Sequence, residues 1–439
     1  SMVLSKLCTL GISMGHHFVK IKSMKNAEDK RYAFIVPARN EKLVIANLIQ
    51  SVRAMDYPQE LVDVIVVADN CDEDDTTAQI ARENGAIVFE RHDPEHRTLG
   101  FALQYMFREF AKERSIEDSY YAYIRLDADN IVAPDYLTKL NDCMQNSDFD
   151  EAVTYRNAKN LDENIVSAMC GMNVYVTNVV GLRPRSILNT SQQVYGPGAC
   201  FRSYLLKDGW NWTGLTEDLD IESDLAAKGY KMGYCEAATF YEEEPTSVKM
   251  FIRQQMRWTK GNLLSFAKYA WPLTKSFFKK PTWDKYDIYW QFFPYSIVSF
   301  YFSLLYNVAS LILFLCVGYA GYDWSNFIAF NVTLIAGIYV GAFLNDLLTV
   351  IKEWKHFHLP LWKTILYLFI FPIYQIINLP VSAVATFMNV KWKHIDHHCV
   401  ADAKDLVAEE QARGLRDSDK SIDAIEPNED IENKPDGEC

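Results

Sequence analysis

Short apolar runs alternate with amphipathic stretches through the first part of the chain, starting at Tyr32. The runs read YAFIVPA, VDVIVVAD and AIVFE, and helical patterns fill the intervals at about 41–55 and 75–84. Because successive positions in each run are apolar, both faces of each strand should be buried. The pattern therefore predicts a parallel sheet flanked by helices, which is an α/β fold of the Rossmann type.

Long uncharged segments replace these short runs after about residue 285. Residues 292–320 carry no charge, and at about 1.5 Å per residue they can cross about 30 Å of hydrocarbon. A second apolar segment covers 325–350, and a third covers 359–390 but is interrupted by Pro372 and Pro380. Tryptophans stand at the ends of these segments, as in membrane proteins: Trp324, Trp354, Trp362 and Trp392. We expect C-terminal transmembrane helices.

Two further segments mix apolar and charged residues. The stretch 268–290 combines lysines with aromatic residues, which is typical of an amphipathic helix in the membrane interface. The start of the chain is mildly apolar but too interrupted for a span, so we interpret it as an interfacial segment or a truncated anchor. The predicted organisation is an N-terminal interfacial segment, a catalytic domain, interfacial helices, a transmembrane region and an acidic tail, at 1–30, 31–265, 266–290, 291–392 and 393–439.

The distribution of lysine predicts the orientation in the membrane. The loop GYDWSN between the first two spans lacks Lys and Arg, whereas the loop KEWKHFHLPLWK after the second is basic. Basic loops stay in the cytoplasm, so the catalytic domain is expected there too, in a protein of the plasma membrane. Lys391 and Lys393 conflict with this scheme unless 359–390 turns back as a broken hairpin. Whether 359–390 crosses the membrane once or turns back as a hairpin stays open at this point.

Composition excludes some other classes of protein. The formal net charge of −13 argues against nucleic-acid binding, which requires clustered Lys and Arg. The nine cysteines occur singly, without a C-x-x-C pair, so neither a zinc site nor a disulfide scaffold is expected. The catalytic part is accordingly expected in a reducing compartment. One interpretation of such a chain does not involve catalysis: a membrane sugar transporter or receptor with an accessory nucleotide-binding domain. Three or four membrane spans are few for a transporter.

The sequence RLDADN at 125–130 ends another predicted strand with two carboxylates. Asp127 and Asp129 alternate along an extended chain, so both point to one side of it. Such a pair suits Mg²⁺ or Mn²⁺, which take oxygen ligands and leave positions open for substrate phosphates. A loop that merely contains acidic residues is the other interpretation. The position at the carboxyl end of a buried strand favours a ligand site.

Two earlier strand ends also carry polar residues. Pro37 and Asn40 in IVPARNE are either turn residues or part of a site. Asp69 ends the strand VDVIVVAD, where its carboxylate can accept a hydrogen bond from the edge of a nucleobase. The acids that follow it, such as Asp75, have the simpler role of capping a helix.

A third group of motifs lies before the apolar segments. Glu217 and Asp218 stand at the start of a predicted helix, where an acid is either a cap or the base that accepts a proton from an acceptor hydroxyl. Gln254, Arg257 and Trp258 follow in RQQMRWTKG. Arginine can bind a diphosphate with two hydrogen bonds, and tryptophan can stack on a sugar face. An amphipathic helix with snorkelling arginine at the membrane is the alternative.

In this order, the motifs resemble those of the family 2 glycosyltransferases, and more closely the membrane-integrated branch with cellulose, hyaluronan and capsule polysaccharide synthases. The resemblance runs from about Arg31 to Gly261 and implies a GT-A fold. It also implies a set of roles: Pro37, Glu41, Asp69, Arg97 and Asp127 would bind the nucleotide diphosphate, Asp127 and Asp129 the metal, Asp218 would be the base, and Glu217, Gln254, Arg257, Trp258 and Gly198 would contact the diphosphate and the acceptor.

The activity that the resemblance implies is inverting, metal-dependent hexosyl transfer from a nucleotide sugar, with uridine diphosphate favoured as the carrier. The acceptor would be a growing polysaccharide that the protein helps to move across the membrane. The alternative is a single addition to a lipid-linked or short saccharide. Membrane lipid is a further expected partner, nucleic acid is not, and homo-oligomerisation stays open. The family's cyclic-dinucleotide-binding domain is not visible after the spans.

Overall fold

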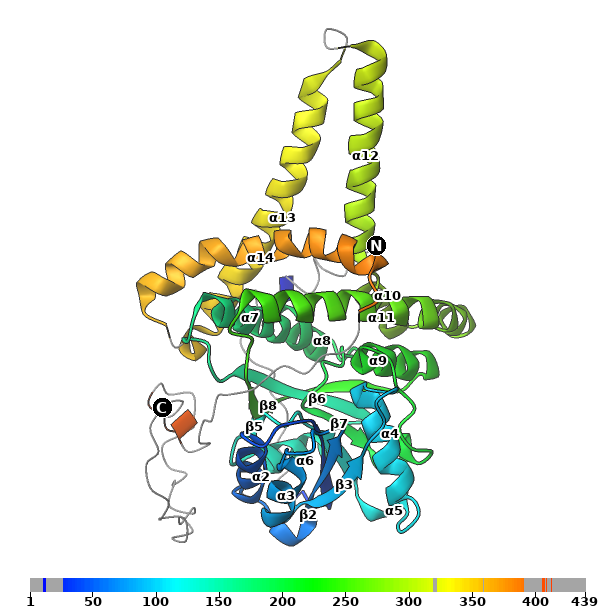
Figure 1. The fold of residues 1–439 in the computed structure, drawn as a ribbon, viewed down its shortest axis with the longest axis vertical. Coiled ribbons are helices and arrows are strands. Elements are labelled where there is room, and N and C mark those ends of the chain that lie inside the picture. The colour runs from blue at the N-terminus through cyan, green and yellow to red at the C-terminus, as the bar shows by residue number, and fades with distance from the viewer. Residues whose placement is uncertain are drawn as a thin grey trace.

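The computed structural model describes residues 27–318, 322–357 and 359–390, together with isolated positions towards either end. Its centre is an eight-stranded sheet with the strand order β3-β2-β1-β4-β7-β6-β8-β5 (Figure 1). The strands are β1 Tyr32–Ala38, β2 Val62–Asp69, β3 Ile87–Arg91, β4 Ala122–Arg125, β5 Ile131–Val132, β6 Glu151–Ala158, β7 Ala199–Arg202 and β8 Met232–Glu242. The predicted amphipathic start of the chain, 1–30, and the acidic tail, 393–439, lie almost wholly outside the described residues.

The first half of the sheet follows the predicted pattern. β3, β2, β1 and β4 are parallel neighbours, and the side chains of Phe34, Ile65 and Ile124 in them are fully buried. This confirms the parallel sheet. The second half is mixed, because β7 runs antiparallel to both β4 and β6, while β6 and β8 are parallel.

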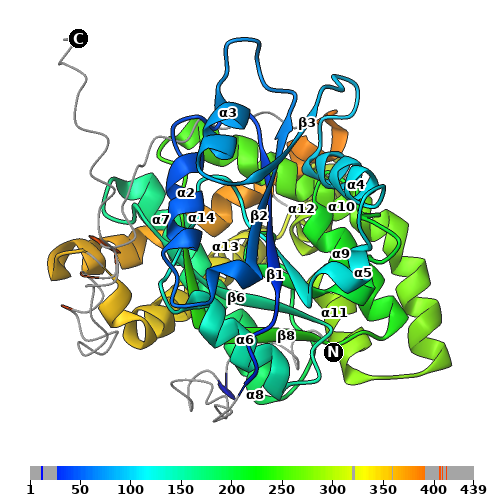
Figure 2. The same cartoon turned by 90° about the horizontal axis from the view of Figure 1, so that it is seen from below.

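Helices cover both faces of the sheet (Figure 2). The two predicted helices are present as α2 and α3, and one hydrophobic core lies between them, α6 and the sheet. The second core lies on the opposite face, where α4 and α9 pack. The helices and their bounds are α2 Ile45–Arg53, α3 Thr77–Glu83, α4 Leu99–Phe110, α5 Ile116–Ser119, α6 Tyr136–Asn146 and α9 Glu217–Lys228.

A continuous helical stretch that the sequence pattern did not predict follows β6. It consists of α7 Ile165–Val176, the π-helical segment η2 Thr177–Leu182 and α8 Arg183–Ile187. It is apolar and long enough to cross a membrane, but over half of its apolar window is buried inside the protein. The structure uses this stretch as a layer between the sheet and the helices above it (Figure 1).

The segment predicted to be interfacial, 266–290, covers the second half of a long helix, α10, and most of a shorter one, α11. α10, Val248–Lys279, begins before the Gln254-x-x-Arg257-Trp258 motif and continues without a break through the lysine-rich and aromatic stretch. The shorter α11, Trp283–Gln291, follows it. Arg185 of α8 donates to Asp287 of α11 (2.6 Å), which ties α11 to the sheet domain.

Three more helices complete the described chain: α12 Tyr295–Val317, α13 Trp324–Lys352 and α14 Leu361–Phe387. With Ile165–Ile187, they make four helices among the described residues that are long and apolar enough to cross a membrane. α12 and α13 extend away from the sheet domain as a hairpin, whereas α14 lies across the base of that hairpin (Figure 1). Pro372 and Pro380 stay inside α14, so the broken hairpin, one of the two topologies that the sequence left open, does not form.

A buried ionic cluster joins the connection between α13 and α14 to the sheet domain. Arg183 donates to Glu236 of β8 (2.6 Å) and to Glu353 after α13 (2.7 Å). Tyr155 of β6 donates to the same Glu353 carboxylate (3.0 Å). Since a buried ion pair that loses one partner costs about 3–5 kcal/mol, this cluster fixes the hairpin's base on the sheet domain.

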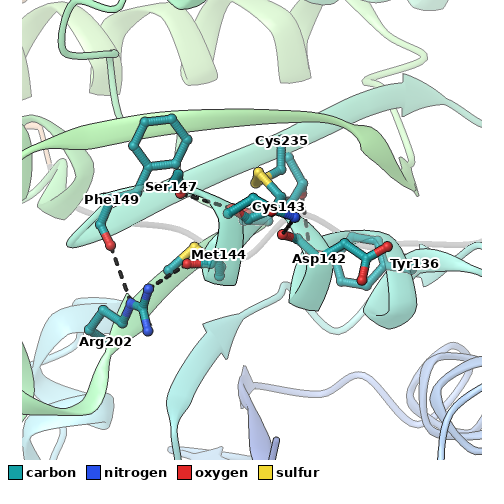
Figure 3. Close-up of a disulfide and its surroundings, with 11 residues drawn as sticks. Tyr136, Asp142, Cys143, Met144, Ser147, Phe149, Arg202 and Cys235 are labelled. Atoms are coloured by element: carbon teal, nitrogen blue, oxygen red, sulfur yellow. Dashed lines mark hydrogen bonds between the residues drawn. A yellow bond between two sulfur atoms is a disulfide. The ribbon is translucent and has the colours of Figure 1, made fainter. Parts of the chain in front are cut away.

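The structure corrects the expectation about cysteine pairing, so the cysteines no longer support a reducing compartment, and a cytoplasmic location of the sheet domain rests on the distribution of lysine alone. Cys143 of α6 and Cys235 of β8 form a disulfide, with Cα atoms 6.0 Å apart (Figure 3). They lie 92 residues apart in sequence, so the absence of a C-x-x-C pair could not exclude their pairing. The bond joins α6 to β8 within the first hydrophobic core.

Candidate active site

A cavity of about 510 Å³ opens at the carboxyl ends of the parallel strands and continues beneath α10. It brings together all but one of the site residues predicted from the sequence. The lining includes Pro37, Glu41, Asp69, Arg97, Asp127, Asp129, Glu217, Asp218, Gln254, Arg257 and Trp258. Motifs spread over more than 200 residues of sequence therefore share one cavity.

Gly198 is the exception, because Gly196 and Pro197 line the cavity in its place. Gly198 has a positive φ of 78°, and a Cβ there would come within 2.5 Å of Phe240 and Thr154. Its backbone N–H donates to the Arg125 carbonyl (2.8 Å). Close packing against Phe240 and Thr154 explains the glycine, and the predicted acceptor contact of this residue stays a prediction.

The two carboxylates of the D-x-D motif are held by different parts of the sheet. Asp127 accepts from the Arg125 guanidinium (2.6 Å), and its own N–H donates to the side chain of Asn130 (2.9 Å). Asp129 is 3% exposed and accepts from the backbone N–H of Glu243, directly after β8 (2.9 Å). Hydrogen bonds from Arg125 of β4 and from the backbone after β8 therefore position the two carboxylates of the motif.

These carboxylates fit a hard divalent cation. They are oxygen donors on the wall of a cavity, and further carboxylates of Glu242 and Glu244 line the same wall. No group of three or more His, Cys, Asp or Glu side chains in the described residues has the arrangement of a complete metal site. A pair of carboxylates completed by substrate phosphates is the usual way in which Mg²⁺ is bound.

Asp69, at the carboxyl end of β2, lines the cavity, but its carboxylate already has partners there. Arg39 and Arg91 each form an ion pair with it at 2.5 Å, and the amide of Asn70 donates to it (2.9 Å). The two arginines were not predicted, because Arg39 follows β1 and Arg91 ends β3. Only the strand order brings these three ends together. Asp69 thus holds two guanidinium groups at this edge of the sheet.

Thr216, Glu217 and Asp218, here called the T-E-D motif, form the start of α9. Arg125, on the adjacent strand β4, lies 3.5 Å from the Glu217 carboxylate, and its Nη1 is buried without a hydrogen-bond partner. Asp218 accepts a hydrogen bond from the backbone N–H of Leu219 (2.9 Å). Gly196 places its backbone against both groups, since a Cβ there would lie 2.8 Å from Arg125 and 4.0 Å from the Asp218 carboxylate. The Gly196 backbone therefore lies close to both the Arg125 guanidinium and the Asp218 carboxylate in the cavity wall.

Burial perturbs the titration of this acid pair. Desolvation raises the pKa of Asp218, while the Leu219 N–H, Arg257 and Arg125 oppose the rise. Desolvation also raises the pKa of Glu217, and the negative charge of Asp218 adds to that rise. A raised pKa makes a carboxylate a better proton acceptor, which is the property of a general base.

The rate of the reaction should depend on pH through this pair. A base acts in its deprotonated form, so activity should be lost as pH falls through a pKa higher than the ordinary 3.8 of Asp. Glu217→Gln removes one negative charge and leaves Arg125 free to stabilise the Asp218 carboxylate, so it should move the acidic limb to lower pH. The measurement is the pH profile of kcat/KM for both proteins. If the acidic limb of the Glu217→Gln profile stays at the same pH or moves to higher pH, a group other than Asp218 controls it.

α10 approaches the T-E-D motif most closely at Gly261. A Cβ on Gly261 would lie 2.2 Å from the hydroxyl and 2.7 Å from the Cβ of Thr216. The Arg257 guanidinium lies 3.5 Å from the Leu215 carbonyl, directly before the motif. Ser265, one turn further along α10, donates to Asp220 of α9 (2.6 Å). These contacts set the distance between Asp218 and the arginine and tryptophan of α10.

Gly261→Ala tests this contact. The added methyl group must push α10 away from Thr216, and overpacking of this kind costs about 1–3 kcal/mol. We expect a lower free energy of unfolding and a larger proportional loss of transfer, because Arg257 and Trp258 move with the helix. Gly337→Ala in α13 is the matched control, since a Cβ there meets nothing within 4 Å. Equal transfer by the two variants would contradict the role of Gly261.

The far end of the cavity has a wall that sequence reasoning missed. Asn173 and Thr177 project into it from α7 and η2, and Tyr195 lies beside them. The Thr177 hydroxyl donates to the Asn173 carbonyl (2.9 Å), which is one turn earlier. A π-helical turn inside an α-helix often marks a functional site, but no simple sequence pattern announces one. These residues add hydroxyl and amide groups to the lining of the cavity.

The chain is similar to known proteins in sequence. Residues 30–261 match the family model described as glycosyltransferase like family 2. The probable glycosyltransferase YdaM of Bacillus subtilis (strain 168) is 23% identical over 292 residues, which are 64% of this chain and 66% of that protein. Glucomannan 4-beta-mannosyltransferase 1 of Oryza sativa subsp. japonica is 26% identical over 273 residues, 59% of this chain and 50% of that protein. The chain thus spans one half to two thirds of these relatives' lengths.

The fold is also similar to a solved structure. The mannosyltransferase PcManGT from Pyrobaculum calidifontis, in complex with GDP-Man and Mn²⁺, superposes with a TM-score of 0.51 at 14% sequence identity. The superposition covers 81% of this chain and 98% of that one. At this identity the similarity concerns the fold alone, and it agrees with a GT-A-like sheet domain.

Proposed function

We propose, since this chain belongs to the glycosyltransferase-like family 2, that it transfers a hexosyl group from a nucleotide sugar to an acceptor hydroxyl at this cavity. The observation that supports the proposal most is the shared cavity of the D-x-D carboxylates, the T-E-D acids and the Arg257-Trp258 pair. Each group meets a separate need of the reaction: charge neutralisation, proton removal and binding of the leaving diphosphate.

Asp218 accepts the proton of the acceptor hydroxyl as that oxygen attacks the anomeric carbon. The attack comes from the face opposite the nucleotide, so the configuration inverts and no covalent enzyme intermediate forms. Arg257 hydrogen-bonds the diphosphate as negative charge develops on it. Trp258 stacks on a sugar ring beside the bond that breaks.

Asp127 and Asp129 would hold Mg²⁺ or Mn²⁺ together with the diphosphate oxygens. The ion, when bound, neutralises charge on the leaving group. The protein's own part is to keep the two carboxylates in place. It does so through Arg125 and through the backbone after β8.

A uridine diphosphate sugar is the first candidate donor, as the family resemblance implies. Asp69 with Arg39 and Arg91 forms the end of the cavity where the nucleotide binds. A guanosine-linked mannose is the second candidate. It is favoured by the rice relative, a mannosyltransferase, and by the GDP-Man complex of the protein with the similar fold.

The acceptor is a growing polysaccharide or, as the second candidate, a lipid-linked or short saccharide. The cavity lining supports an approach from the membrane side, because it includes Ser296 at the start of α12 and Tyr374 in the middle of α14. We place the protein in the plasma membrane through its apolar helices, with the sheet domain in the cytoplasm, where the basic loop after α13 also lies.

The experiment is to incubate detergent-purified full chain with each nucleotide sugar in turn and with Mg²⁺ or Mn²⁺, and to measure nucleoside diphosphate release. Release with one donor supports the transferase proposal, and gel analysis of the product separates a polymer from a single addition. Absence of release with every donor, while nucleotide still binds, would favour the transporter or receptor alternative.

A further inference from the structure

α14 packs on α7 and α10 of the sheet domain as well as on the bases of α12 and α13. Its first half packs on α7, where Leu368 and Phe371 share a buried cluster with Tyr175. Its second half follows α10, as two contacts show. The Tyr374 hydroxyl accepts from Gln255 (2.6 Å), and further along, Lys260 donates to the Thr386 carbonyl (2.9 Å).

The direction of α14 follows from these contacts. Between them the chain advances five residues along α10 and twelve along α14, so the two helices run side by side in the same sense. α10 is itself bound to α9 through Ser265 and Asp220. A helix fixed in this way on the surface of the sheet domain cannot also leave that surface to cross a bilayer. Figure 1 shows α14 lying across the base of the upright α12–α13 hairpin.

The face of α14 turned away from α7 and α10 is apolar and largely exposed among the described residues, apart from contacts with α12 and α13 such as that of Phe369 with Phe343 (ring centroids 5.3 Å apart). Its exposed large side chains recur at intervals of three or four residues as far as Ile373, as expected for one side of a helix, and two more lie near its end: Leu361, Trp362, Ile365, Leu366, Phe369 and Ile373, then Val384 and Phe387. α12 and α13, which rise from the same base, also expose large apolar side chains. The apolar face of α14 is therefore continuous with the surface that would contact lipid.

Charge agrees with this placement. Lys352 and Lys363 lie on either side of the connection before α14, while Lys391 and Lys393 follow the helix in the sequence. If α14 crossed the bilayer, the last two would lie on the side opposite the first two. If it does not cross, all four lie on the side of the sheet domain, as the preference of lysine for the cytoplasmic side requires.

We propose that α14 lies in the plane of the membrane leaflet that faces the sheet domain, with its apolar face among the acyl chains. Among the described residues, only α12 and α13 then cross the bilayer. The partner of the exposed face is a lipid surface. The inference rests on the membrane attachment that is part of the proposed function.

Depth measurements test the inference on the full chain in lipid vesicles. Spin labels at Ile373→Cys, midway along α14, and Val308→Cys, midway along α12, start from similar exposure, 43% and 45%. The accessibility of each label to oxygen and to a water-soluble nickel complex gives its depth. We expect the label at position 308 near the bilayer centre and the label at position 373 close to the headgroups. Equal, deep positions would overturn the inference, whereas a label at 308 that contacts water would overturn membrane attachment itself.

Sided labelling gives an independent result. Asp208→Cys in the sheet domain, Ser325→Cys at the start of α13 and Asn389→Cys after α14 are placed in one chain, and sealed vesicles are treated with a membrane-impermeant maleimide. Peptide mass spectrometry then identifies each labelled site against the native cysteines. In vesicles with the sheet domain outside, positions 208 and 389 should both be labelled, and position 325 only after the vesicles are opened. In vesicles of the opposite orientation, position 325 should be labelled first and the other two only after opening. Labelling of 389 together with 325 would show a third crossing.

Discussion

Replacing Asp218 by Asn should nearly abolish sugar transfer while donor binding stays close to that of the unchanged protein. The amide has almost the same shape but cannot accept the proton of the acceptor hydroxyl, and a positioned base contributes about 10²–10⁴-fold to the rate. The measurements are the transfer rate at saturating donor and the Kd for the nucleoside diphosphate. Loss of transfer with an unchanged Kd separates a chemical role from a structural one.

Asp224→Asn is the matched control for this substitution. Asp224 lies on the same helix, where it accepts from Trp212 (3.0 Å) and from Lys228 (2.7 Å), and it does not line the cavity. This variant should retain transfer within a few-fold. If Asp218→Asn also retained transfer, the base would have to be another group, and Glu217, which shares the same cavity wall, would be examined first.

Asp129→Asn should reduce transfer by roughly 10³-fold, and Mn²⁺ should bind weakly to the variant in the presence of nucleotide. Removing one carboxylate from a two-carboxylate site leaves few protein ligands, and the charge stabilisation by the metal is worth several kcal/mol. Isothermal titration with Mn²⁺ and nucleoside diphosphate, next to the transfer assay, measures both effects. The titration does not depend on activity, so it separates lost metal binding from lost folding.

Asp142→Asn, on α6 outside the cavity, is the control for this second substitution. It should leave both Mn²⁺ binding and transfer unchanged. If Asp129→Asn kept full Mn²⁺ affinity, other oxygen atoms of the cavity wall would have to bind the ion. The carboxylates of Glu242 and Glu244 would then be the next to test, although Arg156 forms ion pairs with both.

The sequence allowed prediction wherever local pattern decides the structure. Val64, Ile65, Val66 and Val67 are buried on both faces of β2, and a continuous apolar run predicts such a strand. The position of Asp127 and Asp129 followed from the same logic, since each strand end carries its polar residues to one edge of the sheet. The D-x-D motif was therefore recognisable before any contact was known.

Prediction failed where the structure depends on neighbours that are distant in sequence. The partners of Asp69, Arg39 and Arg91, meet only because β1, β2 and β3 are adjacent. Cys143 and Cys235 pair across 92 residues. Hydropathy identified α14 as apolar, but apolar length does not specify whether a helix crosses a membrane or lies along it.

The continuity of α10 has a mechanical consequence. The turns that present Arg257 and Trp258 to the cavity are the same turns that support α14 through Gln255 and Lys260. No hinge separates the two sets of contacts, so a displacement of α14 is transmitted directly to the groups around the diphosphate. For a helix seated in lipid, bilayer thickness and lateral pressure then become variables of the reaction rate. The same enzyme should turn over at different speeds in short-chain and long-chain lipids.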